Sequence, residues 1–314
     1  MQKRGLPFAG KPLFYFTPSI TVLKPKIMNT TRLQIAVQKS GRLLDDSLKL
    51  LKECGISIDN GRDQLKAQAR NFPVDILYLR NSDIPQYVQD GVADVGIIGQ
   101  NTVVEKQKAI KEVLPLGFST CRLSIALPKG APFNDPQDLN QKRIATSYPN
   151  SLRQYLKKHH ITAEIHEISG SVEIAPNIGL ADAICDLVSS GSTLFKNGLE
   201  EKDIILKSEA VVVSSEELSE EAQVILDKLV FRIKSVLAAR NNKYLLMNAP
   251  NESVDRIIDI LPGMKSPTVM PLATSGWSSI HTVITEDRFW DIIEELKEAG
   301  AQGILVVPIE KMIL

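Results

Sequence analysis

Short apolar runs that alternate with helical patterns are the feature that most limits how this chain folds. Strand-like runs at 33–37, 74–79 and 94–98 are separated by helical patterns at 44–54 and 82–90. Alternation of strands and helices is typical of an α/β domain built on a mostly parallel sheet. We therefore expect an α/β lobe in the first part of the chain.

A second set of similar elements follows. Strand-like runs at 122–127, 143–146, 165–168 and 182–188 accompany a helical pattern at 151–158 and the expected start of a helix at 174–179. The 314 residues are too many for one ordinary core and suit two or three domains. We expect two α/β lobes with a cleft between them, joined by crossings near Cys121 and Ile205. The predicted boundaries give lobe I residues 28–120 and 205–218, and lobe II residues 121–204.

The tail from residue 219 to residue 314 has a different pattern. A long helical pattern at 221–240 precedes elements in the order βαββαβ, which is the ferredoxin-like plan. The expected elements lie at 244–248, 253–261, 268–272, 279–284, 287–299 and 303–307. Such a domain commonly binds a small ligand or forms dimers, although the fold alone assigns no function.

The N-terminal residues 1–27 are expected to form a disordered extension. Residues 1–44 contain no Asp or Glu, and an apolar stretch at 13–23 loosely suggests a signal peptide. Pro18 interrupts this stretch, no small-x-small cleavage site follows, and Met28 opens a segment that looks like an ordinary protein start. We therefore expect a cytoplasmic protein, with an organelle transit segment as the less favoured alternative.

Composition excludes several classes of function. Lys+Arg and Asp+Glu both number 37, so bulk charge does not drive nucleic-acid binding. No apolar run is long enough for a membrane helix. The three cysteines lack CxxC spacing and the four histidines lack ligand spacing, which argues against a zinc site or a disulfide framework.

The segment DAICDLVSSGSTL, residues 182–194, is the most informative for chemistry. Its strand-like run carries two acids four positions apart, and small polar residues follow directly. Small residues let backbone N–H groups surround an anion, hydroxyls add donors, and carboxylates accept from ribose hydroxyls. The pattern favours a ribose 5-phosphate site over the alternative, a polar turn before a capped helix. The candidates are Asp182, Asp186, Ser189, Ser190, Gly191, Ser192 and Thr193.

Three charged residues elsewhere are candidates for catalysis. Lys39 and Arg42 follow the first strand, where open α/β sheets bind ligands, and are assigned to pyrophosphate or triphosphate oxygens. A solvated loop with a helix cap is the alternative. Glu173 follows a strand and Gly170, and a carboxylate there suits ribose hydroxyls or developing positive charge. The alternative for Glu173 is an acid in the first turn of a helix.

Further polar residues near strand ends are candidates for ATP binding or for the wall of the cleft. They are Arg80, Asp83, Asp94, Asn101, Thr146 and Tyr148. Tyr148 is expected to contact the adenine, and Thr146 or Ser147 to donate hydrogen bonds, while plain packing is the alternative for Tyr148. Asp83 is equally natural as a helix cap.

The acid pair with its Ser/Thr-Gly-x-Thr loop resembles the phosphoribosyl pyrophosphate (PRPP) loop of phosphoribosyltransferases. The segments QKSGRL, RNSDIP, GVADVGIIGQN, KRIATSYP, GSVEIAP and ILVVPIEKM resemble those of the ATP phosphoribosyltransferase family, in the family's order, from about Met28 to the C-terminus. The resemblance implies a two-lobed core like that of periplasmic binding proteins, with a C-terminal ferredoxin-like regulatory domain. It also implies attack of adenine N1 of ATP on PRPP to give phosphoribosyl-ATP and pyrophosphate, the first step of histidine biosynthesis. Mg²⁺ is then held mainly by substrate.

The same resemblance implies regulation by the tail. The segment SPTVMPL resembles the family's histidine-binding loop and strand, which makes Ser266 and Thr268 candidate contacts for L-histidine as an allosteric inhibitor. A β-turn at Pro267 is the alternative. The family interconverts between a dimer and a hexamer. Two other functions remain open from the residues alone, a two-lobed small-molecule binding protein and a catalytically silent amino-acid sensor.

Overall fold

A computed structural model describes residues 31–59, 65–261 and 266–313. The extension expected at residues 1–27 lies outside these ranges. Among the helices of the described residues, none combines the length and apolar character needed to cross a membrane.

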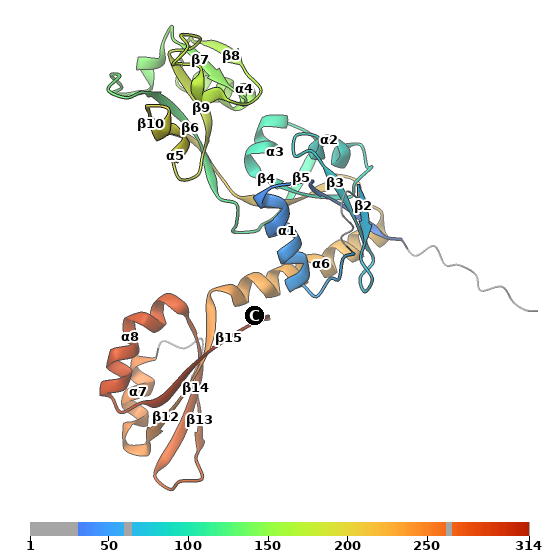
Figure 1. Ribbon diagram of the computed structural model, residues 1–314. Helices are drawn as coiled ribbons and strands as arrows, with labels where there is room; N and C mark the ends of the chain where they lie inside the picture. Colours follow the sequence, from blue (N-terminus) through green and yellow to red (C-terminus); the bar gives the residue numbers. More distant parts are fainter. Residues whose placement is uncertain (1–30, 60–64, 262–265, 314) are drawn as a thin grey trace, which may run out of the picture. The chain divides into compact units, whose positions relative to one another are not determined.

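Lobe I is built on a six-stranded sheet with the strand order β2-β3-β1-β4-β11-β5 (Figure 1). The central strand β1 pairs in parallel with β3 and β4, while the outer strands pair antiparallel. Its strands are β1 (Leu33–Gln38), β2 (Lys66–Gln68), β3 (Val74–Leu79), β4 (Val95–Gly99), β5 (Ile110–Pro115) and β11 (Ala210–Ser215). Its helices are α1 (Arg42–Glu53), α2 (Ile84–Gln89) and α3 (Gln100–Lys106).

The two faces of this sheet are buried by different helices. Successive side chains of a strand point to opposite faces, so Ile35 and Val37 lie in one core cluster and Ala36 in another. The first cluster also contains Leu50 of α1 and Leu229 of α6 (Glu220–Arg240), and the second contains side chains of α2. Helix α6 therefore packs into the core of lobe I, although the predicted boundary placed it with the C-terminal domain.

A five-stranded sheet forms the second unit, in the order β10-β6-β9-β7-β8. β7 pairs in parallel with β8 and β9, and β6 lies antiparallel to β9 and β10. Its strands are β6 (Cys121–Pro128), β7 (Arg143–Thr146), β8 (Glu164–Glu167), β9 (Ala183–Val188) and β10 (Leu199–Ser208). Its helical segments are η1 (Pro136–Leu139), α4 (Pro149–Lys158), η2 (Val172–Ile174) and α5 (Ser192–Lys196). The chain passes between the two sheets twice, from β5 to β6 and from β10 to β11.

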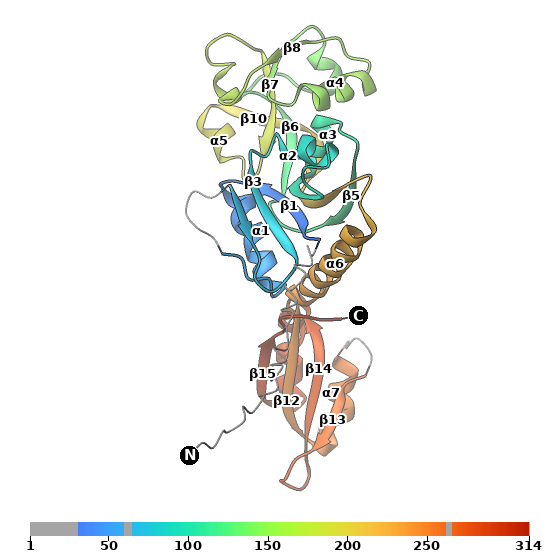
Figure 2. The same ribbon diagram turned by 90° about the vertical axis from the view of Figure 1, so that its right-hand side faces the viewer.

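The C-terminal sheet is antiparallel and has the order β13-β14-β12-β15 (Figure 2). Helices α7 and α8 pack on one of its faces around a separate apolar core that includes Leu245, Ile280 and Leu296. The elements are β12 (Asn242–Pro250), η3 (Asn251–Ser253), α7 (Val254–Ile260), β13 (Thr268–Pro271), β14 (Trp277–Thr285), α8 (Glu286–Glu298) and β15 (Gln302–Pro308). The predicted βαββαβ order is confirmed, and with it the fold class.

The sequence analysis missed some elements and misjudged one. β2 and β5 were not predicted because they are largely exposed and lack an apolar repeat. α3 was not predicted because it is short and begins directly after β4. The helix expected from Ile174 is only the end of η2, since Pro176 and Gly179 follow it closely. The domain boundaries themselves remain predictions.

Candidate active site

The carboxyl ends of the parallel strands in the first sheet bring several predicted residues to one edge. The register pairs Gln38 with Leu79 and places Ile97 beside β1, so Lys39 and Arg80 follow neighbouring strand ends. The Lys39 N–H donates to the Leu79 carbonyl at 2.8 Å, and the side chains of Lys39 and Arg80 are exposed. Ligands of open α/β sheets bind at such an edge.

Arg42 lies at the same edge because it is the first residue of α1. Gly41 precedes it with φ 91°, a left-handed conformation that glycine adopts without strain, and no side chain caps this helix start. In the described part of the chain, Lys39 and Arg42 have no ion-pair partner. Two cations and the positive end of a helix therefore face solvent together, an arrangement that attracts a polyanion.

Asp83 lies at the start of α2, the position where a cap is expected. Its carbonyl accepts from the Gln86 N–H at 3.0 Å, while its carboxylate accepts from the Ser82 hydroxyl at 2.9 Å instead of capping the helix. The Asp83 side chain is exposed and lies only three residues beyond Arg80. It remains near the edge, and its role stays a prediction.

The structure does not bring Asp94 and Asn101 into the cleft. Asp94 precedes β4, at the opposite edge of the sheet, where its carboxylate accepts from the Gln34 N–H at 2.7 Å and burial raises its pKa. Asn101 is only 5% exposed and exchanges two hydrogen bonds with Ser208, at 2.9 and 3.0 Å. Both side chains form hydrogen bonds within the fold, and those of Asn101 stabilise the crossing from β10 to β11.

The loop that follows β9 has the form expected of an anion site. Gly191 adopts φ 78°, and α5 begins at Ser192 without a side-chain cap. Ser190 and Ser192 share a hydrogen bond of 3.1 Å between their hydroxyls, and the Ser189 carbonyl accepts from Arg122 at 3.0 Å. Thr193 is exposed. Hydroxyls and N–H groups of this loop are therefore available to a phosphate.

Asp186 lies on β9, the strand that leads into this loop, and forms an electrostatic cluster with Glu173 and Tyr148. Burial raises the pKa of Asp186, the Glu173 carboxylate raises it further, and the Leu187 N–H lowers it through a hydrogen bond of 2.8 Å. Burial, together with the Asp186 carboxylate, also raises the pKa of Tyr148, which keeps the phenol neutral. The cluster offers hydrogen-bond acceptors and a neutral aromatic ring to a polar ligand.

Asp182 is not part of this cluster. On a strand, residues four apart share a face but lie about 13 Å from each other, so Asp182 is at the far end of β9 from the loop. Its carboxylate pairs with Arg143 at 2.8 Å, and the resulting hydrogen bonds lower the pKa of Asp182 to about 2. The spacing that suggested a paired site therefore separates the two acids.

Thr146 supports the site from within the core. It is fully buried, and its hydroxyl donates to the Cys185 carbonyl at 2.7 Å and accepts from the Tyr148 N–H at 2.8 Å. Its hydroxyl holds Tyr148 beside β9, and because Thr146 also lines the cavity next to Tyr148, its contact with ATP stays a prediction.

A cavity of about 740 Å³ lies next to Tyr148 and is lined by residues of both lobes. Lobe I contributes Asn81, Ser82, Thr102, Glu105, Lys106 and Lys108, and lobe II contributes residues 146–150 and 167–169. The sequence analysis missed Lys106 and Lys108, two cations at and just after the end of a helix that was itself not predicted. The volume and the polar lining suit a nucleotide.

Glu105 is another residue of this wall that sequence reasoning missed. It is 6% exposed, and its carboxylate accepts from the N–H groups of Asn150 and Ser151 at 3.0 and 2.9 Å and from the Ser151 hydroxyl at 2.8 Å. These donors form the first turn of α4 in lobe II, whereas Glu105 belongs to α3 in lobe I. The carboxylate therefore joins the two lobes beside the cavity.

The predicted histidine contacts lie at and just before the start of β13 in the C-terminal domain. The Ser266 hydroxyl donates to the Pro267 carbonyl at 3.4 Å, and Thr268 opens β13, where it pairs with His281. Both side chains are exposed. Residues 262–265, just before them, lie outside the described ranges, so these assignments stay predictions.

Comparison with known proteins agrees with this arrangement. A family model described as ATP phosphoribosyltransferase matches residues 80–235, and one described as the HisG C-terminal domain matches residues 239–311. An ATP phosphoribosyltransferase of Cytophaga hutchinsonii is 56% identical over 284 residues, covering 90% of this chain and 99% of the relative. The Phocaeicola vulgatus enzyme is 53% identical over 282 residues, 90% of this chain and 100% of the relative.

Solved structures include a related complex. The ATP phosphoribosyl transferase (HisG:HisZ) complex from Thermotoga maritima aligns with a TM-score of 0.55 and 30% identity, covering 64% of this chain and 98% of that one. The family matches favour the transferase over a binding protein or a silent sensor. The two-lobed α/β core, the loop after β9 and the two adjoining family models together show that this chain belongs to the ATP phosphoribosyltransferase family, with the C-terminal domain of its long form.

Proposed function

We propose that this chain transfers the 5-phosphoribosyl group of PRPP to N1 of ATP, giving phosphoribosyl-ATP and pyrophosphate, as the first step of L-histidine biosynthesis. The observation that carries the proposal is the loop after β9, with Gly191 in a left-handed conformation and an uncapped helix start, backed by Asp186. The loop holds the 5-phosphate of PRPP, and Asp186 accepts hydrogen bonds from the ribose hydroxyls.

The leaving group lies toward lobe I. Lys39 and Arg42 stand exposed where β1 ends, and Arg80 follows the neighbouring strand. Arginine offers two parallel donors to phosphate oxygens, and lysine adds a point charge. Pyrophosphate departs as a polyanion, so cations that stabilise it more strongly as it leaves lower the barrier.

ATP occupies the cavity beside Tyr148. The neutral phenol ring packs against adenine, and Lys106 and Lys108 reach the triphosphate from α3 and the residues after it. The Glu173 carboxylate stabilises positive charge as the anomeric carbon becomes oxocarbenium-like. Adenine N1 is already a nucleophile, so alignment of two polyanions contributes more than a strong base.

The pyrophosphate of PRPP would supply most of the oxygen ligands of a Mg²⁺ ion. Within the described residues, no three His, Cys, Asp or Glu side chains gather as a set of metal ligands. Mg²⁺ prefers substrate phosphate oxygens and water, with one or two carboxylates, and Asp186 with Glu173 supplies oxygens of that kind. When bound, the ion neutralises charge on the departing pyrophosphate.

L-histidine is the proposed allosteric inhibitor, bound at the C-terminal domain near Ser266 and Thr268. The support is the match of residues 239–311 to the family's C-terminal domain model. Inhibition then requires that histidine bind one conformation or assembly more tightly than another. A dimer and a hexamer are the two assemblies that we propose.

An ultraviolet assay tests the reaction. The purified chain is mixed with ATP, PRPP and Mg²⁺, with pyrophosphatase to pull the equilibrium, and phosphoribosyl-ATP is followed by its absorbance. Product that requires both substrates supports the proposal. A folded chain that binds ATP or PRPP and forms no product would overturn it.

A further inference from the structure

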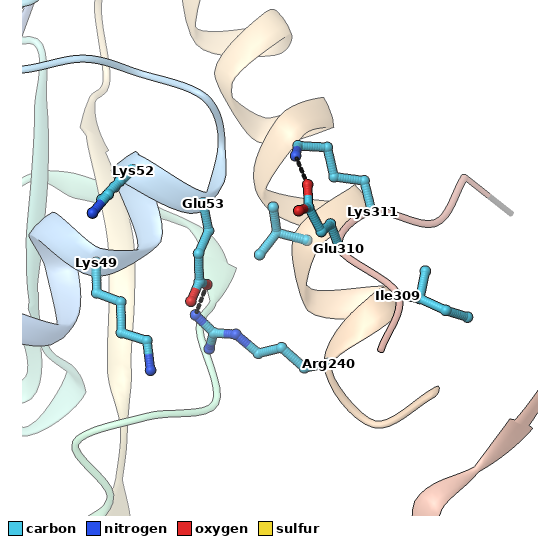
Figure 3. A pocket seen from close by; sticks show the side chains of 8 residues that line it. Lys49, Lys52, Glu53, Arg240, Ile309, Glu310 and Lys311 are labelled. Carbon is cyan, nitrogen blue, oxygen red and sulfur yellow. Dashed lines mark hydrogen bonds and ion pairs between the residues drawn. The ribbon is translucent and has the colours of Figure 1, made fainter. Parts of the chain in front are cut away.

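A basic pocket lies where three segments distant in sequence meet. The last turns of α1, the end of α6 and the segment after β15 enclose a cavity of about 500 Å³ (Figure 3). The segment after β15 is tied to α6 by the Met312 N–H, which donates to the Ser235 carbonyl at 2.9 Å. We call this cavity the junction pocket, and its lining residues are Lys49, Lys52, Glu53, Val236, Arg240, Ile309, Glu310 and Lys311.

The junction pocket has an excess of positive charge. Its two carboxylates are already engaged, since Glu53 pairs with Arg240 at 3.0 Å and Glu310 with Lys311 at 3.2 Å (Figure 3). Lys49 and Lys52 extend from α1, and neither has an ion-pair partner among the residues that the structure describes. Two uncompensated positive charges therefore remain in the pocket.

Ion pairs among the described residues do not use this excess, although Lys52 lies in the last turn of α1, where the helix dipole favours a cation. Lys49 and Lys52 are three residues apart on one helix, where like charges repel each other. Arg240 is held in place by Glu53 and lies over the Phe118 ring at 5.8 Å, so its guanidinium is oriented before any ligand binds. Oriented arginine with flexible lysines is the combination that proteins use for phosphate groups.

We propose that the junction pocket binds the diphosphate group of a small anion, through Lys49, Lys52, Arg240 and Lys311. A cavity of this volume lies within the range of small-ligand sites. Free pyrophosphate and a nucleoside diphosphate both carry this group. The site is separate from the catalytic residues, because it lies at the opposite end of α1 from Arg42.

Calorimetric titration with the active site blocked tests the site. Binding of phosphoribosyl-ATP to the full-length chain is measured first, which tests the proposed function on its own. The protein saturated with PRPP, which fills the proposed pyrophosphate subsite at Lys39 and Arg42, is then titrated with inorganic pyrophosphate, and the protein saturated with phosphoribosyl-ATP is titrated separately with ADP. The test variant is Lys49→Gln with Lys52→Gln, and the matched control is Lys228→Gln with Lys234→Gln, which removes the same charge from exposed positions of α6 outside the pocket.

Pyrophosphate is expected to bind the blocked wild type and the control variant alike, and to bind the test variant about tenfold more weakly, with kcat unchanged. Equal affinity for ADP means that the diphosphate alone is recognised, and tighter binding of ADP means that a nucleoside is recognised as well. No binding to the blocked wild type, or an equal loss in both variants while their melting temperatures match wild type, would overturn the site.

Discussion

At the scale of single residues, Asp186 shows how burial prepares a carboxylate for binding and costs stability at the same time. Its raised pKa means that the folded chain holds this proton more tightly than the unfolded chain. Its contribution to stability is therefore lost as the pH rises through its raised pKa, and at neutral pH the charge is a cost. Substrate hydroxyls offset this cost only when PRPP is bound.

Asp186→Asn is accordingly expected to raise the melting temperature at pH 7 while lowering kcat/KM for PRPP about 100-fold. The amide oxygen keeps the acceptor for the Leu187 N–H, and the repulsion from Glu173 disappears. Thermal melting and steady-state kinetics measure the two effects. Asp182→Asn is the matched control, because Asp182 lies on the same strand face but pairs with Arg143 at the other end.

The control is expected to lose at most about 1 kcal/mol of unfolding free energy, since its ion pair is partly exposed, and to keep its KM for PRPP. The pKa of Asp182 is lowered to about 2, so this stability is present above about pH 4 and is lost as the pH falls toward 2. A KM for PRPP raised as much in the Asp182 variant as in the Asp186 variant would restore the paired-acid interpretation of the sequence.

The pH dependence of the reaction gives an independent check on Asp186. Ribose hydroxyls donate to the ionised carboxylate, and protonation removes that acceptor. Because burial raises the pKa of Asp186 above its ordinary value of 3.8, kcat/KM for PRPP is expected to fall with decreasing pH already above that value. This acid limb is expected to be absent in Asp186→Asn. An unchanged limb in the variant would assign the titration to another group.

At the scale of elements, the contact between α3 and α4 joins the lobes beside the proposed ATP cavity. Glu105→Ala leaves the Asn150 and Ser151 N–H groups and the Ser151 hydroxyl without their acceptor. The loss of unfolding free energy is expected to be about 2–4 kcal/mol, measured by urea denaturation. Glu112→Ala removes an exposed carboxylate that accepts from Gln100 at 3.2–3.3 Å, and it is expected to change this free energy by less than about 0.5 kcal/mol. Equal losses would remove the special role of Glu105.

The positions of most strands and helices were predictable from sequence, but the distant residues that their side chains contact were not. The apolar runs of β1, β3 and β4 and the βαββαβ order could be read from periodicity, because burial imposes it. Asp182 and Asp186 were predicted as a pair because spacing along a strand was taken as proximity. Arg143 and Glu105 owe their roles to strand order and to the approach of two lobes, which depend on contacts far apart in the sequence.

At the scale of the whole molecule, the position of α6 decides where the chain can be divided. Its apolar side chains lie in the core of the first sheet, so a cut after Ser219 would expose that core. A chain ending at Asn241 keeps α6 and is expected to form product without inhibition by histidine, measured in the same ultraviolet assay. Persistent inhibition would place the histidine site outside the C-terminal domain.

A point variant of the full-length chain separates loss of the site from loss of folding. Thr268→Ala is expected to need about tenfold more histidine for half inhibition. The control is Thr274→Ala, at the exposed turn between β13 and β14, which is expected to respond like wild type.

The loop after β9 is the centre of this account, and Thr193→Ala tests it most directly. The exposed Thr193 hydroxyl is proposed to bind the 5-phosphate of PRPP and not ATP. The measurement is the KM for each substrate in wild type, Thr193→Ala and Thr193→Ser. We predict a KM for PRPP raised about tenfold in the alanine variant and restored by serine, with the KM for ATP unchanged. An equal rise for both substrates, or none for PRPP, would contradict the assignment of the loop.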